Sequence, residues 1–198
     1  MAARKLLLRC SALALAAALY ALPSLAEPAV YRIDPARTRA EFTVEHLGVF
    51  HAQGRFPNVS GRLLFDAAAH AGSVDLEIPV SSVATGWDAR DDFIRGARMF
   101  DASQYPRMRF RSTRFTFEGE RLVRVDGDLT LRDVTRPVSL TVRRLDCGRG
   151  TDDKQEGCAA EAAGLIRRRE FAMDAWWPII GDEVELRFHL TAVREQVP

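Results

Sequence analysis

The segment Arg39-Ala-Glu-Phe-Thr-Val-Glu-His46 alternates between polar and apolar side chains. Its even-numbered positions are apolar as far as Val44, and its odd-numbered positions are polar. Successive side chains of a β-strand point to opposite faces of a sheet. The period of two therefore predicts a strand with one face in a core and the other in water. His46 continues the inward parity, which is unusual for a polar residue.

The same alternation recurs along the chain and predicts about eight strands. Glycine-containing polar stretches such as Glu118-Gly119-Glu120 separate these segments and predict short turns. Between Trp87 and Phe100 the apolar residues are instead spaced by one, three and four, which predicts a short amphipathic helix. The alternating apolar positions are Val59, Gly61, Leu63 and Phe65; Val74, Leu76, Ile78 and Val80; Met108 and Phe110; Phe115 and Phe117; Leu129 and Leu131; Val138, Leu140 and Val142; and Val184, Leu186, Phe188 and Leu190.

Eight sequential strands that are each dry on one face can form a β-sandwich or a closed antiparallel barrel. Periodicity alone does not separate the two, although short hairpin connections favour the barrel. An eight-stranded barrel either fills with side chains or holds one small ligand. We see no repeat and no internal linker, so residues 27–198 are expected to form one all-β domain.

The first 26 residues have the pattern of an export signal. Arg4 and Lys5 precede an apolar run, and Ser24-Leu25-Ala26 supplies small residues for cleavage. The alternative is a retained membrane anchor, because the run approaches spanning length. The first 26 residues hold three basic residues and no acidic one. Cleavage would therefore leave 25 basic and 27 acidic residues and change the formal net charge from +1 to −2.

That charge gives no basis for nucleic-acid binding, which needs a concentrated basic surface. After cleavage two cysteines remain, Cys147 and Cys158, on either side of a polar glycine-containing loop. In an oxidising compartment such a pair most simply forms a disulfide. A metal or redox motif would need closer spacing or neighbouring histidines, which the sequence lacks.

The sequence contains no arrangement of residues that would form a reaction centre. The serines lie in no nucleophile-elbow motif and no phosphate-binding glycine loop is present. His46 and His51 make a weak metal pair, and the run Arg167-Arg168-Arg169 is interpreted as a strand whose outer face is solvated. We therefore predict no catalytic residue, no metal and no cofactor.

Read in order, several short motifs resemble the YceI-like family of bacterial periplasmic proteins, which are lipocalin-like binders of polyisoprenoid and other long-chain lipids. The most specific are Phe100-Asp-Ala-Ser-Gln-Tyr105-Pro106 and Leu129-Thr-Leu-Arg-Asp-Val-Thr-Arg-Pro137. The matching stretches extend from Tyr31 to about Val193. The chain departs from the family pattern at Ala172, where a glycine commonly follows Phe171.

The resemblance implies an eight-stranded antiparallel lipocalin-like barrel with a short helix between strands and a hydrophobic central channel. It also implies a periplasmic binding or carrier protein for long-chain amphiphiles, such as isoprenoids or isoprenoid quinones. The alternative is a stress-related structural or protein-interaction module whose barrel is filled by side chains. Transient membrane contact and a homodimer are both compatible with the sequence.

The expected channel lining consists of the apolar residues with inward parity. His46 and Arg90 are expected to face the ligand's head group, with Asp91 orienting Arg90 and Tyr105 as a further donor. The alternatives are that His46 is a satisfied core residue and that Arg90 and Asp91 form a surface ion pair that anchors the helix. The expected apolar lining is Phe42, Val44, Leu63, Phe65, Leu76, Ile78, Phe93, Phe110, Leu129, Leu131, Val138, Leu140, Leu186 and Phe188.

Overall fold

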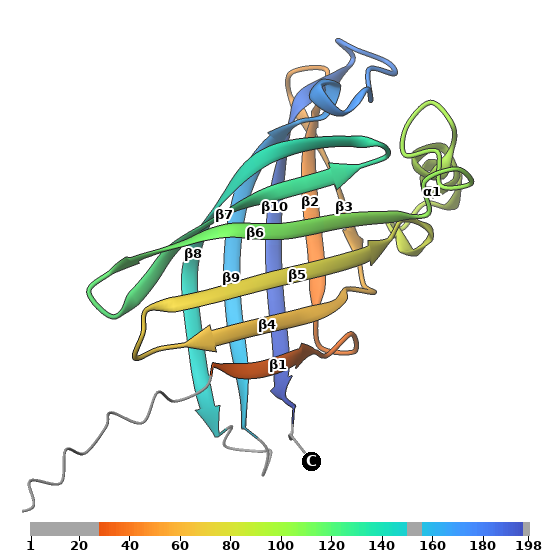
Figure 1. The fold of residues 1–198 in the computed structure, drawn as a ribbon. Coiled ribbons are helices and arrows are strands. Elements are labelled where there is room, and N and C mark those ends of the chain that lie inside the picture. The colour runs from red at the N-terminus through yellow and green to blue at the C-terminus, as the bar shows by residue number, and fades with distance from the viewer. Residues whose placement is uncertain (1–27, 150–155, 196–198) are drawn as a thin grey trace, which may run out of the picture.

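A computed structural model describes residues 28–149 and 156–195 (Figure 1). The predicted export signal at residues 1–26 lies outside this range. Within it, strands dominate and one α-helix forms. The elements are β1 (Ala29–Ile33), β2 (Arg39–His46), β3 (Phe50–Phe56), β4 (Ser60–Asp66), β5 (Ala71–Pro79), the 3-10 turn η1 (Val80–Ser82), α1 (Asp88–Arg95), β6 (Arg107–Glu118), β7 (Arg121–Leu131), β8 (Val134–Arg149), β9 (Glu156–Arg167), the 3-10 turn η2 (Arg168–Phe171) and β10 (Ile180–Arg194).

The strands form a closed antiparallel barrel, so the barrel prediction is confirmed and the sandwich alternative is wrong. Strands β4 to β10 pair in sequence order, and β1 closes the ring by pairing with β4 on one side and β10 on the other. Short hairpins between sequential strands make this order the simplest way to remove sheet edges. The ring comprises β1 and β4 to β10. Figure 1 shows it from the side.

The β2–β3 hairpin lies outside that ring order and extends one end of the barrel. Along the same edge, β10 pairs with β2 from Ile180 to His189 and with β1 from Ala192 to Arg194. An isolated bridge between Arg55 and Ala84 joins the free side of β3 to the segment after β5. The hairpin therefore adds two strands to the barrel wall at one end. The helix α1 and the loop after η2 lie at the same end (Figure 1).

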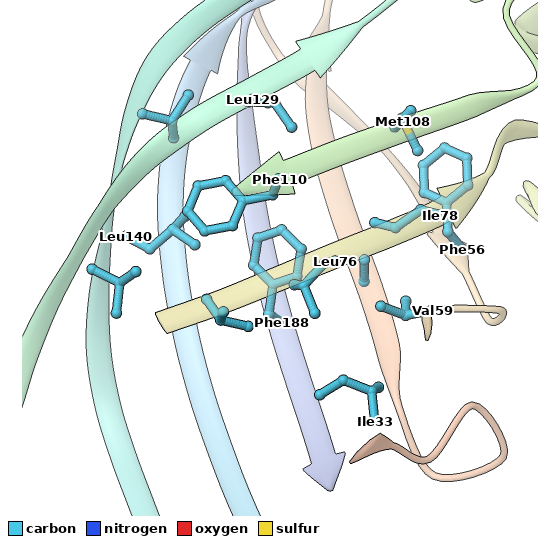
Figure 2. Close-up of a cluster of buried hydrophobic side chains, with 14 of the residues drawn as sticks. Ile33, Phe56, Val59, Leu76, Ile78, Met108, Phe110, Leu129, Leu140 and Phe188 are labelled. Carbon is cyan, nitrogen blue, oxygen red and sulfur yellow. The ribbon is translucent and has the colours of Figure 1, made fainter. Parts of the chain in front are cut away.

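The half of the barrel away from that hairpin is packed with side chains. Ile33, Val59 and Leu76 are at most 1% exposed. Figure 2 shows side chains from several strands pointing into the interior, among them Leu76 and Leu140. Burying an aliphatic or aromatic side chain of this size contributes roughly 1.5–3 kcal/mol. This packed half accounts for much of the stability of the fold.

The helix is shorter than the sequence predicted. It runs from Asp88 to Arg95 and ends before Gly96, whereas the apolar spacing had suggested a helix from Trp87 to Phe100. After Arg95 the chain turns back on itself, and the amide of Phe100 bonds to the carbonyl of Ile94 at 3.1 Å. The helical spacing of apolar residues extends beyond the end of α1 because Phe100, which lies in the following turn, packs against the same hydrophobic core.

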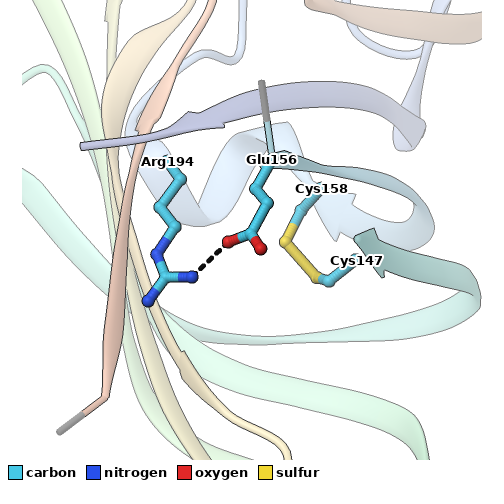
Figure 3. The surroundings of a disulfide bond; sticks show 4 residues. All are labelled: Cys147, Glu156, Cys158 and Arg194. Carbon is cyan, nitrogen blue, oxygen red and sulfur yellow. Dashed lines mark hydrogen bonds and ion pairs between the residues drawn. A yellow bond between two sulfur atoms is a disulfide. The ribbon is translucent and has the colours of Figure 1, made fainter. Parts of the chain in front are cut away.

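The predicted disulfide is confirmed. Cys147 on β8 and Cys158 on β9 are directly paired in register and joined by an S–S bond (Figure 3). Glu156 and Arg194 form an ion pair beside it. Cross-linking the two strands here holds the end of the barrel that is opposite the β2–β3 turn.

Candidate ligand-binding cavity

A cavity of about 440 Å³ occupies the half of the barrel near the β2–β3 hairpin, α1 and the loop after η2. This volume lies in the range of about 300–1,000 Å³ that is usual for small-molecule sites. Its wall is mostly apolar and is formed by β2, β3, β6, β7 and β10 together with α1 and residues 173–180. One end of the barrel is thus hollow and the other is filled.

Most residues expected from the sequence to line a channel do line this cavity. Their inward parity on the strands, or their position on the inner side of α1, brings them together. They are Phe42, Val44, His46, Ile78, Arg90, Phe93, Phe110, Leu129, Leu131, Leu186 and Phe188.

The other expected residues lie away from the cavity. Leu63, Leu76, Val138 and Leu140 belong to the buried core of the filled half. Their parity places them inside the barrel, but parity does not specify the level along the barrel axis at which the interior is open.

Two aromatic residues of the expected set also lie elsewhere. Phe65 stacks on Phe117 with ring centroids 6.4 Å apart. Tyr105 lies under the guanidinium of Arg132, whose central carbon is 5.6 Å from the ring centre. Neither of them lines the cavity.

Sequence reasoning missed several lining residues because they lie on turns, on loops or at the ends of strands, where alternation does not mark the inner face. The loop between η2 and β10 supplies three of them, Met173, Trp176 and Ile179. The others are Phe56, Met99, Phe100, Arg168 and Ile180. The density of tryptophan and isoleucine in residues 176–180 is the one sequence signal that points to this loop.

A glycine opposite Phe42 makes room for the ring that forms part of the cavity wall. Gly54 pairs with Phe42 across the β2–β3 hairpin. A Cβ atom on Gly54 would lie 2.3 Å from Cζ of Phe42 and 2.8 Å from Cγ2 of Thr85. Because contacts this short do not occur, any other residue here would displace the ring.

Thr85 joins Asp91 and Arg90 in a network at the edge of the cavity. Oδ1 of Asp91 accepts hydrogen bonds from the amide and the hydroxyl of Thr85, at 2.8 and 2.5 Å. Nε of Arg90 donates to the Thr85 hydroxyl at 2.9 Å, and Nη2 donates to the Thr85 carbonyl at 2.9 Å. Asp91 is therefore linked to Arg90 through Thr85. Among the described residues no direct ion pair joins the two side chains.

Arg168 is buried, so the interpretation of Arg167 to Arg169 as a solvated strand face is wrong at this position. Its side chain is 2% exposed because β9 ends at Arg167 and the η2 turn directs Arg168 inward. The guanidinium donates to four backbone carbonyls, which satisfies most of its hydrogen-bonding capacity. The acceptors are Met173, Ala175, Ile180 and Gly181, at 2.6, 3.0, 2.7 and 2.7 Å.

Burial lowers the pKa of Arg168, and the nearby carboxylates of Asp182 and Asp174 act in the opposite direction. A guanidinium remains charged even after such a shift. Arg168 therefore holds residues 173–181 together as a cap over the cavity. The sequence around Arg167 to Arg169 has the pattern of a strand and does not indicate that Arg168 binds the carbonyls of residues 173–181.

His46 lies at the end of β2, directly opposite Ile180 of β10. Its side chain is half-buried and faces the cavity. Its Nδ1 atom is buried and makes no hydrogen bond within the described part of the chain. His46 therefore lies on the cavity wall, and its role there stays a prediction.

The open end of the cavity has an exposed apolar rim, formed by residues 47–50, 87 and 176–179. All three tryptophans of the chain lie here and are 51–63% exposed. Trp87 and Trp176 also line the cavity, so the rim continues into it. An arginine side chain lies over each tryptophan ring: Arg90, Arg98 and Arg169 lie over Trp87, Trp176 and Trp177, respectively.

The described residues contain no group of histidine, cysteine or acidic side chains that could hold a metal ion. Across residues 28–149 and 156–195, no helix has the length and apolar character required to cross a membrane. The mostly apolar wall of the cavity, with a few polar side chains, suits the burial of an apolar molecule.

Comparison with known proteins gives a consistent result. The YceI-like domain matches residues 31–192. The chain is 34% identical over 186 residues to UPF0312 protein plu2095 of Photorhabdus laumondii, which covers 91% of this chain and 95% of that protein. It is 33% identical over 173 residues to Protein YceI of Salmonella arizonae, covering 85% and 88% of the two chains.

Solved structures share the fold. Burkholderia cenocepacia BcnA superposes with a TM-score of 0.68 at 27% identity, over 80% of this chain and 98% of that one. A polyisoprenoid binding domain from Saccharophagus degradans gives a TM-score of 0.64 at 19% identity, over 85% and 99% of the two chains, and this likeness concerns the fold alone. The sequence motifs, the closed barrel and these matches together establish that the chain belongs to the YceI-like family.

Proposed function

We propose that this protein binds one long-chain amphiphilic lipid of the isoprenoid or acyl type in the cavity and carries it through the periplasm. The main support is the open, apolar cavity at one end of a barrel whose other end is filled. Burying hydrocarbon contributes about 0.8 kcal/mol per methylene. Ten buried carbons would thus contribute about 8 kcal/mol before the costs of association and ordering are subtracted.

The fold relatives include a polyisoprenoid binding domain, which supports the isoprenoid class of ligand. The rival function, a filled barrel that acts only through protein contacts, agrees with the packed half of the barrel but leaves the cavity without a role. The described residues hold no constellation typical of catalysis, and binding is therefore the function that the site favours.

The periplasmic location rests on two features. Residues 1–26 have the pattern of a cleaved signal peptide, which would leave residues 27–198 as the mature domain. The bond between Cys147 and Cys158 is of a kind that persists in oxidising compartments. A carrier must also collect a water-insoluble ligand, and the exposed apolar rim offers a surface for transient contact with a membrane.

The first experiment tests whether the purified protein contains lipid. Organic extraction followed by mass spectrometry should recover a long-chain species in stoichiometric amount. Repeated absence of any such species, together with failure to take up added prenyl alcohol, would favour the filled-barrel alternative.

A pair of tryptophan substitutions tests where the lipid lies. Leu131 lines the cavity, whereas Leu140 packs in the filled half, 2.7 Å from the position that a Cβ on Gly164 would take. We expect Leu131→Trp to fold and to lose most lipid uptake. Leu140→Trp should instead cost roughly 1–3 kcal/mol of stability through overpacking. Uptake is measured by extraction, and stability by urea unfolding. Normal uptake by a folded Leu131→Trp protein would contradict the proposed location.

A further inference from the structure

One edge of β8 has no partner strand near the end of the barrel that carries the disulfide. β7 pairs with β8 only from Val134 to Thr141, and the two strands then diverge (Figure 1). On its other side β8 pairs with β9 as far as Arg149. Among the described residues, no strand pairs with the side of residues 143–147 that faces away from β9. We call this side of residues 143–147 the β8 edge.

The pairing with β9 determines which backbone groups the β8 edge presents. Opposed residues of an antiparallel pair are alternately hydrogen-bonded, with Cα atoms about 5.5 Å apart, and non-hydrogen-bonded, with Cα atoms about 4.5 Å apart. The opposed residues Cys147 and Cys158 have Cα atoms 4.1 Å apart, so they form a non-hydrogen-bonded pair (Figure 3). The N–H and C=O groups of Cys147 therefore point away from β9. By alternation, those of Leu145 also point to the β8 edge.

The side chains of this segment divide between the two faces of the sheet. Leu145 lies on the inner face and packs against the hydrophobic core. Arg144 and Asp146 lie on the outer face, where successive residues of a strand alternate with the inner ones. They form an ion pair with each other and remain 63% and 59% exposed. One positive and one negative side chain thus flank a central leucine.

A second copy of the same segment is complementary to the β8 edge. In an antiparallel pair with a two-fold axis at Leu145, each Leu145 opposes its counterpart, and each Arg144 opposes Asp146 of the second copy. Opposite charges that face each other across two strands stabilise the pair. The four charged side chains then alternate in sign on the outer face. The two Leu145 residues exchange both N–H···O=C bonds, because their backbone groups already point to this edge.

The charges select this register. A two-fold axis at Asp146 would place the two aspartates opposite each other, and an axis at Arg144 would do the same with the two arginines. Like charges directly opposite each other destabilise a strand pair. Charged side chains on an exposed edge usually prevent it from pairing with another chain. Here the order Arg144-Leu145-Asp146 instead favours pairing with an identical segment in one register.

We propose that the β8 edge is a homodimer interface that joins the β8–β9–β10 walls of two barrels into one continuous antiparallel sheet. The proposal is independent of the lipid-binding function. β8 begins beside Leu131 on the cavity wall and runs toward the end of the barrel that carries the disulfide. Antiparallel pairing therefore points the two cavity mouths in opposite directions and leaves both apolar rims uncovered.

Sedimentation velocity of the mature protein tests this interface. We expect a monomer–dimer equilibrium that shifts toward the dimer between about 10 μM and 1 mM, because so short an edge contact is smaller than a standard stable interface. As a second readout, hydrogen exchange of the Leu145 and Cys147 amides should slow as the dimer forms, because these N–H groups point to the β8 edge.

Charge exchange between Arg144 and Asp146 is the diagnostic experiment. Asp146→Arg turns two attractive pairs into repulsive ones, and Arg144→Asp does the same, so each should weaken dimerisation about tenfold. The double variant carrying both changes restores opposite charges and should recover the parent affinity to within about threefold. Circular dichroism and urea unfolding verify that each variant is folded.

Two control variants separate the β8 edge from other surfaces. Glu185 and Arg187 form a similar exposed pair on β10, which is paired with a strand on both sides there, so Glu185→Arg should leave dimerisation unchanged. Val49→Ser combined with Phe50→Ser alters the apolar rim and should also dimerise like the parent.

Three results would overturn the proposal. The first is a parent protein that stays monomeric at the highest concentration. The second is a dimer that the single charge variants leave intact, or that only the rim variant disrupts. The third is a folded double variant that dimerises no better than the single variants. Recovery by the double variant, with slowed exchange at Leu145, supports the two-fold pairing at this residue.

Discussion

At the scale of single residues, Arg168 shows how a charged side chain can become structural. Its neighbours Arg167 and Arg169 remain near the surface, while Arg168 turns inward at the end of β9 and fixes the loop that caps the cavity. The turn requires a left-handed residue at its end. Ala172 adopts this conformation with φ of 56°. Glycine is favoured there because it lacks the Cβ that makes left-handed backbone costly.

We predict that Arg168→Met lowers the free energy of unfolding by roughly 3–5 kcal/mol, because it leaves four carbonyls, two of them buried and two part-buried, without their donors. The matched control is Arg167→Met at the preceding position. Arg167 is 61% exposed and its Nη2 lies 3.8 Å from Glu183, so this change should cost less than about 1 kcal/mol. Urea unfolding followed by circular dichroism gives both values. Equal stabilities of the two variants would show that the carbonyl contacts of Arg168 do not hold the cap.

At the scale of elements, an acidic residue on β7 links three consecutive strands on the outer face of the barrel. Asp126 accepts a hydrogen bond from the hydroxyl of Ser139 on β8 at 2.6 Å and from Arg114 on β6 at 2.8 Å. These contacts lower the pKa of Asp126 below its ordinary value of 3.8, the hydrogen bond from Ser139 most of all. The folded state therefore binds this proton less readily than the unfolded chain does.

The sign of that shift predicts a pH dependence. A carboxyl whose pKa is lowered on folding contributes its stability above its ordinary pKa and loses it as the pH falls through the lowered value. We expect the stability advantage of the parent over Asp126→Asn to be constant near neutral pH and to shrink below about pH 4. Urea unfolding between pH 6 and pH 2 measures this, with the exposed Asp128→Asn as control. An advantage that persists unchanged to pH 2 would contradict the prediction.

At the scale of the whole molecule, the two ends of the barrel differ. One end is cross-linked by Cys147 and Cys158, and the other has an open cavity surrounded by exposed apolar side chains. Val49 and Phe50, at the tip of the β2–β3 hairpin, are 69% and 65% exposed. Tryptophan and large aliphatic residues are well suited to the interface between a membrane and water. The rim is thus the part of the molecule where lipid would enter.

We predict that the mature protein binds vesicles of phosphatidylethanolamine and phosphatidylglycerol through this rim. Val49→Ser combined with Phe50→Ser should weaken binding at least tenfold, because each buried apolar side chain contributes roughly 1.5–3 kcal/mol. Vesicle sedimentation measures the affinity. A blue shift of the tryptophan emission provides a second readout, since all three tryptophans lie on the rim. The control is Leu165→Ser, an exposed apolar residue on the barrel wall at 55% exposure. An equal loss of binding in the control would show that docking does not use the rim.

Local sequence patterns predicted most strands of this protein, their inward-facing residues and its disulfide. The alternation in Arg39 to His46 corresponds to β2, and the alternation elsewhere predicts the strands and their inner faces because the period of two is fixed by the backbone itself. The spacing of Cys147 and Cys158 around one loop likewise predicted their bond. Motif order predicted the family, since the matching stretches span nearly the whole barrel.

Only the tertiary structure decided which part of the barrel is hollow. Leu131 and Leu140 have the same inward parity and both belong to the buried core, yet only Leu131 lines the cavity. The difference arises from the tilt of the strands, the position of the β2–β3 hairpin and the cap held by Arg168. All three depend on contacts between residues far apart in sequence. A side chain's face is a local property of its strand, whereas its depth in the barrel and its free hydrogen-bonding capacity are set by everything packed around it.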